Sequence, residues 1–159
     1  MNGSKRYHHV AFATLAVVTL LTATVRDLSA APKVVEMLNS HDGRTMAFSK
    51  PLLHISVGEQ VHFKATDPTH SVSFIQGGVP AGVKPLKGVF NQDTHYTFEK
   101  PGIYAYKCPA HYGMGMVAII VVGKDLHNLA QVQSLSLMPA ARKRLGAILK
   151  QLEMELQTK

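Results

Sequence analysis

The sequence predicts a mainly β domain, a sandwich or a barrel, followed by a helical tail. Three observations predict this fold class. Short runs of alternating apolar and polar residues, separated by turn residues, fill positions 34–123. A continuous apolar run, Val117–Val122, indicates a fully buried strand, and leucines recur at helical spacing near the C-terminus. Several short strands with turn signals at this spacing are typical of sandwiches and barrels.

Each expected strand ends at turn residues such as Gly58-Glu59 or Lys100-Pro101-Gly102. The clearest expected strands cover residues 53–57, 61–65, 72–75, 96–98, 103–107 and 117–122. Successive side chains of a strand point to opposite faces, so Tyr104, Tyr106 and Cys108 share one face of the fifth of these strands. Cys108 therefore emerges at a strand end.

The tail, residues 125–159, changes to a helical period. Pro139 suits the first turn of an amphipathic helix. The apolar stripe of this helix comprises Leu145, Ile148, Leu149, Leu152 and Leu156. A shorter helix is expected from Asp125 to about Ser134. The cluster Arg142-Lys143-Arg144 is interpreted as a solvated helix face, with partner binding as the less favoured alternative.

Residues 1–30 are typical of a secretory signal peptide. A basic start, Lys5-Arg6, precedes an apolar segment, and Leu28-Ser29-Ala30-Ala31-Pro32 offers small residues for cleavage after Ala30 or Ala31. A membrane anchor is the alternative, but roughly 16 apolar residues interrupted by threonines fall short of the ~20 needed to span a bilayer. The sequence therefore predicts export, with no stable membrane insertion of the mature protein.

Charge gives a first indication of partners. The chain has 17 Lys and Arg and 10 Asp and Glu, and three basic residues and one acidic residue lie in the first 30 positions, so the mature part carries a net charge of +5. Such a charge steers a compact protein towards acidic protein surfaces. Nucleic acid is a poor alternative as a partner, given the export signal and the absence of a dense basic and aromatic stripe.

The single cysteine, Cys108, lies in a cluster of metal-ligating residues. His111 follows three positions later, and the thioethers of Met114 and Met116 come soon after. Two histidines, one thiolate and a weak axial methionine are the ligands of a blue-copper electron-transfer site. The best candidate for the second histidine is His70, which precedes an expected strand. Copper binding also explains an unpaired thiol in an exported protein.

Other interpretations of these residues are less favoured. A lone cysteine is usually a small buried hydrophobe, but here thiol, imidazole and thioether coincide in one short loop. Zinc also binds sulfur and nitrogen, but structural zinc sites prefer several cysteines and do not recruit thioethers. The remaining histidines of the mature chain are interpreted as background: His41, His54, His62, His95 and His127.

On the ligand cluster, the signal peptide and the helical tail, the chain resembles the pseudoazurins, periplasmic cupredoxins of bacteria. The resemblance runs from about Val35 to the C-terminus and is strongest at Pro101-Gly102-Ile103-Tyr104 and from Cys108 to Val117. It implies an eight-stranded Greek-key β-sandwich over residues 31–124, with two α-helices in residues 125–159 packed on it. The copper ligands that it implies are His70, Cys108, His111 and Met116, so it favours Met116 over Met114.

The resemblance also implies a function: a monomeric, periplasmic, non-enzymatic carrier of one electron with one copper ion. Its partners would be periplasmic redox proteins, such as a denitrification reductase or c-type cytochromes. They would dock through an apolar patch around His111 and basic residues such as Lys87 and Lys107. The alternatives are a copper-delivery protein, for which exposed Met- and His-rich tracts are missing, and a multicopper oxidase fragment, for which no further His-x-His pattern occurs.

Three positions depart from the family pattern. Asparagine usually follows the first ligand histidine, where this chain has Ser71. The loop usually reads Cys-Thr-Pro-His, where this chain has Pro109 and Ala110 between cysteine and histidine. Unlike proline, Ala110 has a backbone N–H. We expect this N–H to donate a hydrogen bond to the Cys108 thiolate and to raise the copper potential.

Overall fold

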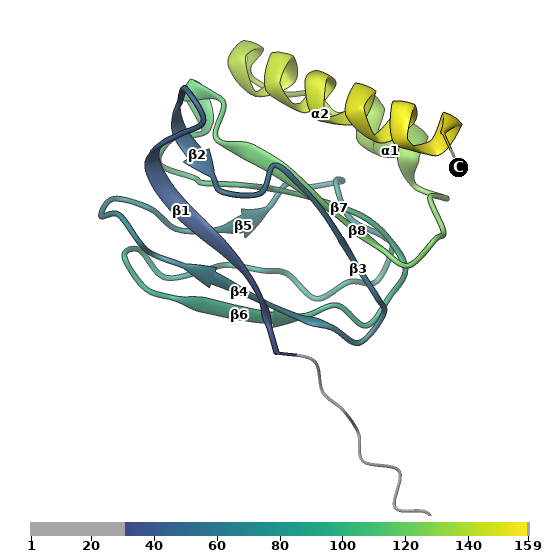
Figure 1. Ribbon diagram of the computed structural model, residues 1–159, viewed down its shortest axis with the longest axis horizontal. Helices are drawn as coiled ribbons and strands as arrows, with labels where there is room; N and C mark the ends of the chain where they lie inside the picture. Colours follow the sequence, from purple (N-terminus) through teal and green to yellow (C-terminus); the bar gives the residue numbers. More distant parts are fainter. Residues whose placement is uncertain (1–30, 159) are drawn as a thin grey trace, which may run out of the picture.

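The computed structural model describes residues 31–158, so the predicted signal peptide lies outside the described residues. Eight strands form two four-stranded sheets, and two helices follow them (Figure 1). The strands are β1 (Lys33–His41), β2 (Arg44–Phe48), β3 (Leu52–Ile55), β4 (Gln60–Lys64), β5 (Ser73–Phe74), β6 (Thr94–Thr97), β7 (Gly102–Lys107) and β8 (Val117–Val122). The helical elements are the 3₁₀ turn η1 (Tyr112–Met114) and the helices α1 (Leu129–Gln133) and α2 (Pro139–Gln157).

The two sheets have the strand orders β2-β1-β4-β6 and β3-β8-β7-β5. The pairs β1/β4 and β3/β8 are parallel, and the other ladders are antiparallel. Strands that are distant in sequence therefore lie side by side, which is typical of a sandwich in which the chain passes from one sheet to the other. The predicted mainly β sandwich with eight strands and two C-terminal helices is confirmed.

The central strand β7 separates two apolar cores. Tyr104, Tyr106 and Cys108 face the core between the two sheets, where Phe63 of β4 meets Tyr106 at a ring distance of 5.2 Å. Ile103 belongs to the second core, on the other side of the sheet. The predicted alternation along this strand is correct, and it places Cys108 inside the sandwich at the end of β7.

The second core lies between the β3-β8-β7-β5 sheet and the two helices, which cover the outer face of that sheet (Figure 1). Helix α2 begins at Pro139, as predicted, and buries Leu145, Ile148, Leu149 and Leu152, whereas Leu156 is exposed. Every residue of β8 is buried because this strand has the sandwich on one side and the helices on the other. An uninterrupted apolar run is the sequence pattern of such a strand.

One buried side chain fixes the short helix to the sheet. The Asn128 side-chain amide donates to Ile103 O at 2.8 Å and its Oδ1 accepts from Ile103 N at 2.9 Å. Asn128 thus replaces a neighbouring strand for one residue of β7. It is only 3% exposed, and both of these hydrogen bonds are buried.

Several expected boundaries are wrong. The first helix begins at Leu129 rather than Asp125, because the Asp125 carboxylate accepts from the His127 N–H and forms a turn first. Strand β5 spans two residues rather than four. Strand β3 ends at Ile55, and Val57 beyond it is half exposed. Within residues 31–158, no helix has the length and apolar character needed to cross a bilayer.

Candidate metal centre

The loop between β7 and β8 is closed by its own backbone hydrogen bonds. The Cys108 N–H donates to Met116 O at 3.0 Å, and the Met116 N–H donates to His111 O at 3.1 Å. The His111 N–H donates to Cys108 O at 3.2 Å, which makes a turn with Pro109 and Ala110 at its centre. Proline suits the first central position of such a turn. The three candidate ligands of the loop are therefore held by one hydrogen-bonded unit.

Helix α2 supports this loop from outside. Gly115 ends η1 with φ of 87°, in the left-handed region that favours glycine. A Cβ at Gly115 would lie 2.8 Å from the carbonyl oxygen of Ala140, in the first turn of α2. The start of the helix and the turn before Met116 are thus in direct contact, and only glycine fits this approach.

His70 lies on the segment between β4 and β5, which connects one sheet to the other. Its side chain is fully buried. The backbone carbonyl of His70 accepts from the Asn91 N–H at 2.8 Å, and Asn91 Oδ1 accepts in turn from the Thr69 N–H. The His70 ring Nε2 lies 3.1 Å from Asn39 Oδ1. An amide oxygen only accepts hydrogen bonds, so Nε2 carries the proton of the His70 ring. Nδ1 is therefore unprotonated, and its lone pair can bind a metal ion.

The three donor atoms of His70, Cys108 and His111 converge. Cys108 Sγ lies 3.7 Å from His70 Nδ1 and 3.6 Å from His111 Nδ1, and the two Nδ1 atoms are 3.2 Å apart. Among the described residues, this is the only group of three or more His, Cys, Asp or Glu side chains arranged to hold a metal ion. One soft sulfur and two imidazole nitrogens fit copper.

Burial prepares His70 for metal binding. Desolvation lowers the pKa of His70, the neighbouring His111 lowers it further, and Asp67 partly opposes them. The neutral imidazole, which is the form that binds metal, is therefore favoured at neutral pH. His111 is partly exposed, so one side of the site reaches the surface.

The two methionines of the loop have different environments. Met116 is fully buried and belongs to the same apolar core cluster as Cys108. Met114 is 51% exposed. This difference favours Met116 as the source of a thioether ligand, in agreement with the expectation from the family resemblance.

Comparison with known proteins agrees with this donor set. Residues 35–123 match the family model of copper-binding proteins of the plastocyanin/azurin family. The chain belongs to this family. It is therefore a copper-binding cupredoxin.

Pseudoazurins are among the similar proteins. The pseudoazurin of Methylorubrum extorquens is 36% identical over 144 residues, which are 91% of this chain and 95% of the relative. The solved pseudoazurin structure from Methylobacterium extorquens AM1 has a TM-score of 0.74 and 36% identity, and covers 77% of this chain and 99% of that chain. A pseudoazurin structure from Sinorhizobium meliloti gives the same score and identity, with 77% and 96% covered.

The expected hydrogen bond from the Ala110 N–H to the Cys108 sulfur is not found. Ala110 is exposed, and among the described residues no hydrogen bond joins its N–H to Cys108 Sγ. The expected potential-raising hydrogen bond is therefore not part of this structure. The reason is the turn geometry, because Ala110 is a central turn residue and the turn hydrogen bond is made by His111 instead. Ser71 is buried and likewise makes no hydrogen bond to the loop.

The surface next to the site combines apolar and basic side chains. Met114 is exposed on the ligand loop, and Val89 and Phe90, which directly precede the Asn91 that binds His70, are 58% and 50% exposed. Lys107 lies over the ring of Tyr112 at 4.3 Å, a cation–π contact that fixes its position beside the loop.

Sequence reasoning missed Asn39, which orients His70 although 31 positions separate the two residues. An asparagine near the end of a long strand has no local signal for this function. The interpretation of the other histidines as background agrees with their contacts: His54, His62 and His127 pair with Glu155, Asp93 and Asp125.

Proposed function

We propose that this protein is a periplasmic blue-copper carrier of one electron, with His70, Cys108, His111 and Met116 as copper ligands. The observation that carries the proposal is the convergence of one thiol and two imidazole nitrogens within 4.8 Å of one another. When bound, a single copper ion supplies a centre that alternates between Cu(II) and Cu(I). The protein supplies the fixed ligands and excludes water.

Each ligand has its own contribution. The Cys108 thiolate gives the strong soft bond that copper prefers, and it is buried away from oxidants. His70 is held by Asn39 with Nδ1 facing the site. Met116 would supply a weak thioether ligand that helps to set the potential. Because packing and hydrogen bonds hold these groups in advance, little rearrangement is needed when the oxidation state changes.

The buried donors argue against the two alternative functions. A delivery protein has to present its copper ligands to a recipient, but Cys108, His70 and Met116 are all 0% exposed. An oxidase needs a second copper cluster, and the described residues contain no second group of metal-ligating side chains. The protein is therefore proposed to be a carrier and not an enzyme.

We further propose that electrons pass through the partly exposed edge of His111. The surrounding exposed residues Met114, Val89 and Phe90 would form the apolar contact with periplasmic reductases or c-type cytochromes, with Lys87 and Lys107 steering acidic partners. Residues 1–30 are proposed as the signal peptide, 31–124 as the copper domain and 125–159 as its helical extension.

Reconstitution with Cu(II) tests the copper site. The loaded protein should absorb intensely in the visible range through thiolate-to-copper charge transfer and show a reversible one-electron wave in voltammetry. Cys108→Ser should abolish both signals, because a hydroxyl does not replace a soft thiolate. Circular dichroism should show that the variant stays folded. A folded Cys108→Ser variant that keeps the intense colour would contradict the ligand assignment.

Reduction kinetics with an acidic redox partner test the docking face. The bimolecular rate should fall as salt rises, because screening removes the steering. Lys87→Glu and Lys107→Glu should slow the reaction more than the matched charge reversals Arg142→Glu and Lys143→Glu on helix α2. Equal effects at both places would show that the copper end is not the docking face.

A further inference from the structure

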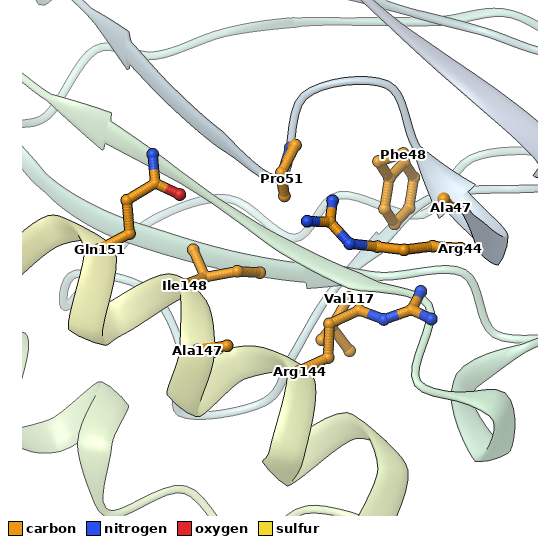
Figure 2. Close-up of a pocket in the computed structure, with 9 residues that line it drawn as sticks. All are labelled: Arg44, Ala47, Phe48, Pro51, Val117, Arg144, Ala147, Ile148 and Gln151. Carbon is orange, nitrogen blue, oxygen red and sulfur yellow. The ribbon is translucent and has the colours of Figure 1, made fainter. Parts of the chain in front are cut away.

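A pocket outside the copper site lies between strand β2, the start of β8 and helix α2 (Figure 2). Its floor is apolar and includes Phe48, Val117 and Ile148. Two arginines and a glutamine complete the lining: Arg44, Arg144 and Gln151. None of the lining residues is acidic. Two cations thus share one concave surface without a carboxylate between them.

The two arginines differ in how they are held. Arg144 reaches from α2 towards β2, where it donates to Met46 O at 2.7 Å and to Thr45 O at 3.2 Å. These bonds occupy two of the five N–H donors of its guanidinium. Arg144 and Arg44 line the same pocket. Desolvation lowers the pKa of Arg144, and the nearby charge of Arg44 lowers it further. The predicted solvated face is therefore wrong for Arg144.

Arg44 has no such partners. It extends from β2 over the pocket towards Pro51 (Figure 2), and within residues 31–158 its guanidinium makes no hydrogen bond or ion pair. Asp42, an acidic residue two positions before Arg44 in the chain, pairs with His41. Along α2, Glu155 already binds His54 and Gln151. Among residues 31–158, neither Arg44 nor Arg144 forms an ion pair with a carboxylate.

We propose that this pocket binds a small oxyanion, such as phosphate or a free carboxylate. A planar guanidinium fork, which Arg44 offers, recognises two oxygens of such an ion at once, and the charge of Arg144 lines the same pocket. The bound anion would neutralise the repulsion between the two arginines and join β2 to α2. Binding depends on neither copper nor a redox partner, so the inference is independent of the proposed function.

The experiment titrates ¹⁵N-labelled Cu(I) protein with inorganic phosphate, and separately with acetate, at constant ionic strength set by chloride. Saturable shifts are expected at the Arg44 side-chain Nε–H and the Val117 amide, and the anion that binds should raise the melting temperature more than chloride does. Arg44→Gln should weaken binding at least about tenfold. It leaves the Arg144 bonds to β2 in place. Arg142→Gln, with the same charge change on α2, should leave binding nearly unchanged.

The two titrations identify the anion, and the variants distinguish specific binding from unspecific attraction. Saturation by phosphate alone assigns a tetrahedral anion, and saturation by acetate assigns a carboxylate. Arg44→Lys keeps the charge but loses the fork, so affinity well below wild type supports bidentate recognition. Linear shifts without saturation for both anions, or equal losses in the Arg44→Gln and Arg142→Gln variants, would overturn the proposal in favour of unspecific attraction to a basic surface.

Discussion

The Nε2 atom of His70 lies 3.1 Å from Oδ1 of Asn39, while Nδ1 of the same ring faces Cys108 Sγ. One amide oxygen therefore decides which nitrogen of a buried imidazole is available to a metal. Partners of this kind commonly change metal affinity by about 10–100-fold when they are removed.

Asn39→Ala should weaken copper binding by about tenfold or more, because the His70 ring loses the acceptor that holds it. The Asn39 backbone N–H binds the Asp67 carboxylate at 2.7 Å, and this bond does not depend on the side chain. The segment around Asp67 should therefore stay in place in the variant. Asn39→Asp should keep affinity and lower the reduction potential, because a negative acceptor makes the imidazole a stronger donor to Cu(II). Competition with a chelator and voltammetry measure the two effects. Identical behaviour of both variants and wild type would show that Asn39 has no influence on His70.

Met116 and Met114 provide a matched pair for the axial ligand. Met116→Gln should change the visible spectrum and lower the potential, because a harder oxygen ligand favours Cu(II). Met114→Gln should chiefly alter the surface, since Met114 is 51% exposed. Spectra and voltammograms of the two variants give the comparison. A larger change from Met114→Gln would reverse the axial assignment.

Gly115→Ala should destabilise the protein and disturb the copper spectrum together. The new Cβ meets the Ala140 carbonyl at 2.8 Å, and the φ of 87° is itself unfavourable for alanine. Gly113→Ala, two residues earlier, is the control, because its Cβ would make only an ordinary contact with Met138 at 3.5 Å. Thermal melts with parallel absorption spectra test this. If both variants behave alike, the helix does not support the loop through Gly115.

Asn128→Ala should lower the free energy of unfolding by about 2–4 kcal/mol, because it leaves the N–H and C=O of Ile103 without partners in a buried place. Gln131→Ala removes an amide from the same short helix, where the amide makes an exposed bond to Gly77, and should cost less than about 1 kcal/mol. Urea denaturation measures both. A loss below 1 kcal/mol for Asn128→Ala would mean that water replaces the amide.

The raised pKa of Tyr104 predicts that the protein loses stability at alkaline pH. Desolvation raises its pKa to about 12, whereas an unfolded tyrosine has a pKa of about 10. Above pH ~10 the unfolded chain loses this proton while the folded chain keeps it, so the free energy of unfolding falls as pH rises. Burial also raises the pKa of Tyr106, which should steepen the fall. Tyr104→Phe should flatten the fall between pH ~10 and ~12 in urea denaturation. An unchanged slope would contradict the prediction.

The features that follow from local patterns were predictable. The alternation that turns Cys108 inward, the apolar run of β8 and the start of α2 at Pro139 depend on residues that are neighbours in the chain. The donors His70, Cys108 and His111 were also recognisable, since few other functions bring these residue types together. The choice between Met114 and Met116 required family resemblance, and burial now supports it.

The features that depend on contacts between distant segments were not predictable. No pattern indicates that Asn39 reaches His70 or that Asn128 acts as a strand neighbour of Ile103. Arg144 illustrates the same limit, because its sequence context is a run of charges whereas its partners lie almost a hundred residues earlier. The order of strands within each sheet is likewise decided by packing.

The closed loop of backbone hydrogen bonds from Cys108 to Met116 has a kinetic consequence. Thermal motion displaces such a unit as a whole, so the sulfur of Cys108 and the imidazole of His111 keep their mutual positions while the loop moves. Ligands fixed in this way would shift little when a bound copper ion changes oxidation state, and this would give a small reorganisation energy. The loop would then make electron exchange fast even with partners that stay bound only briefly.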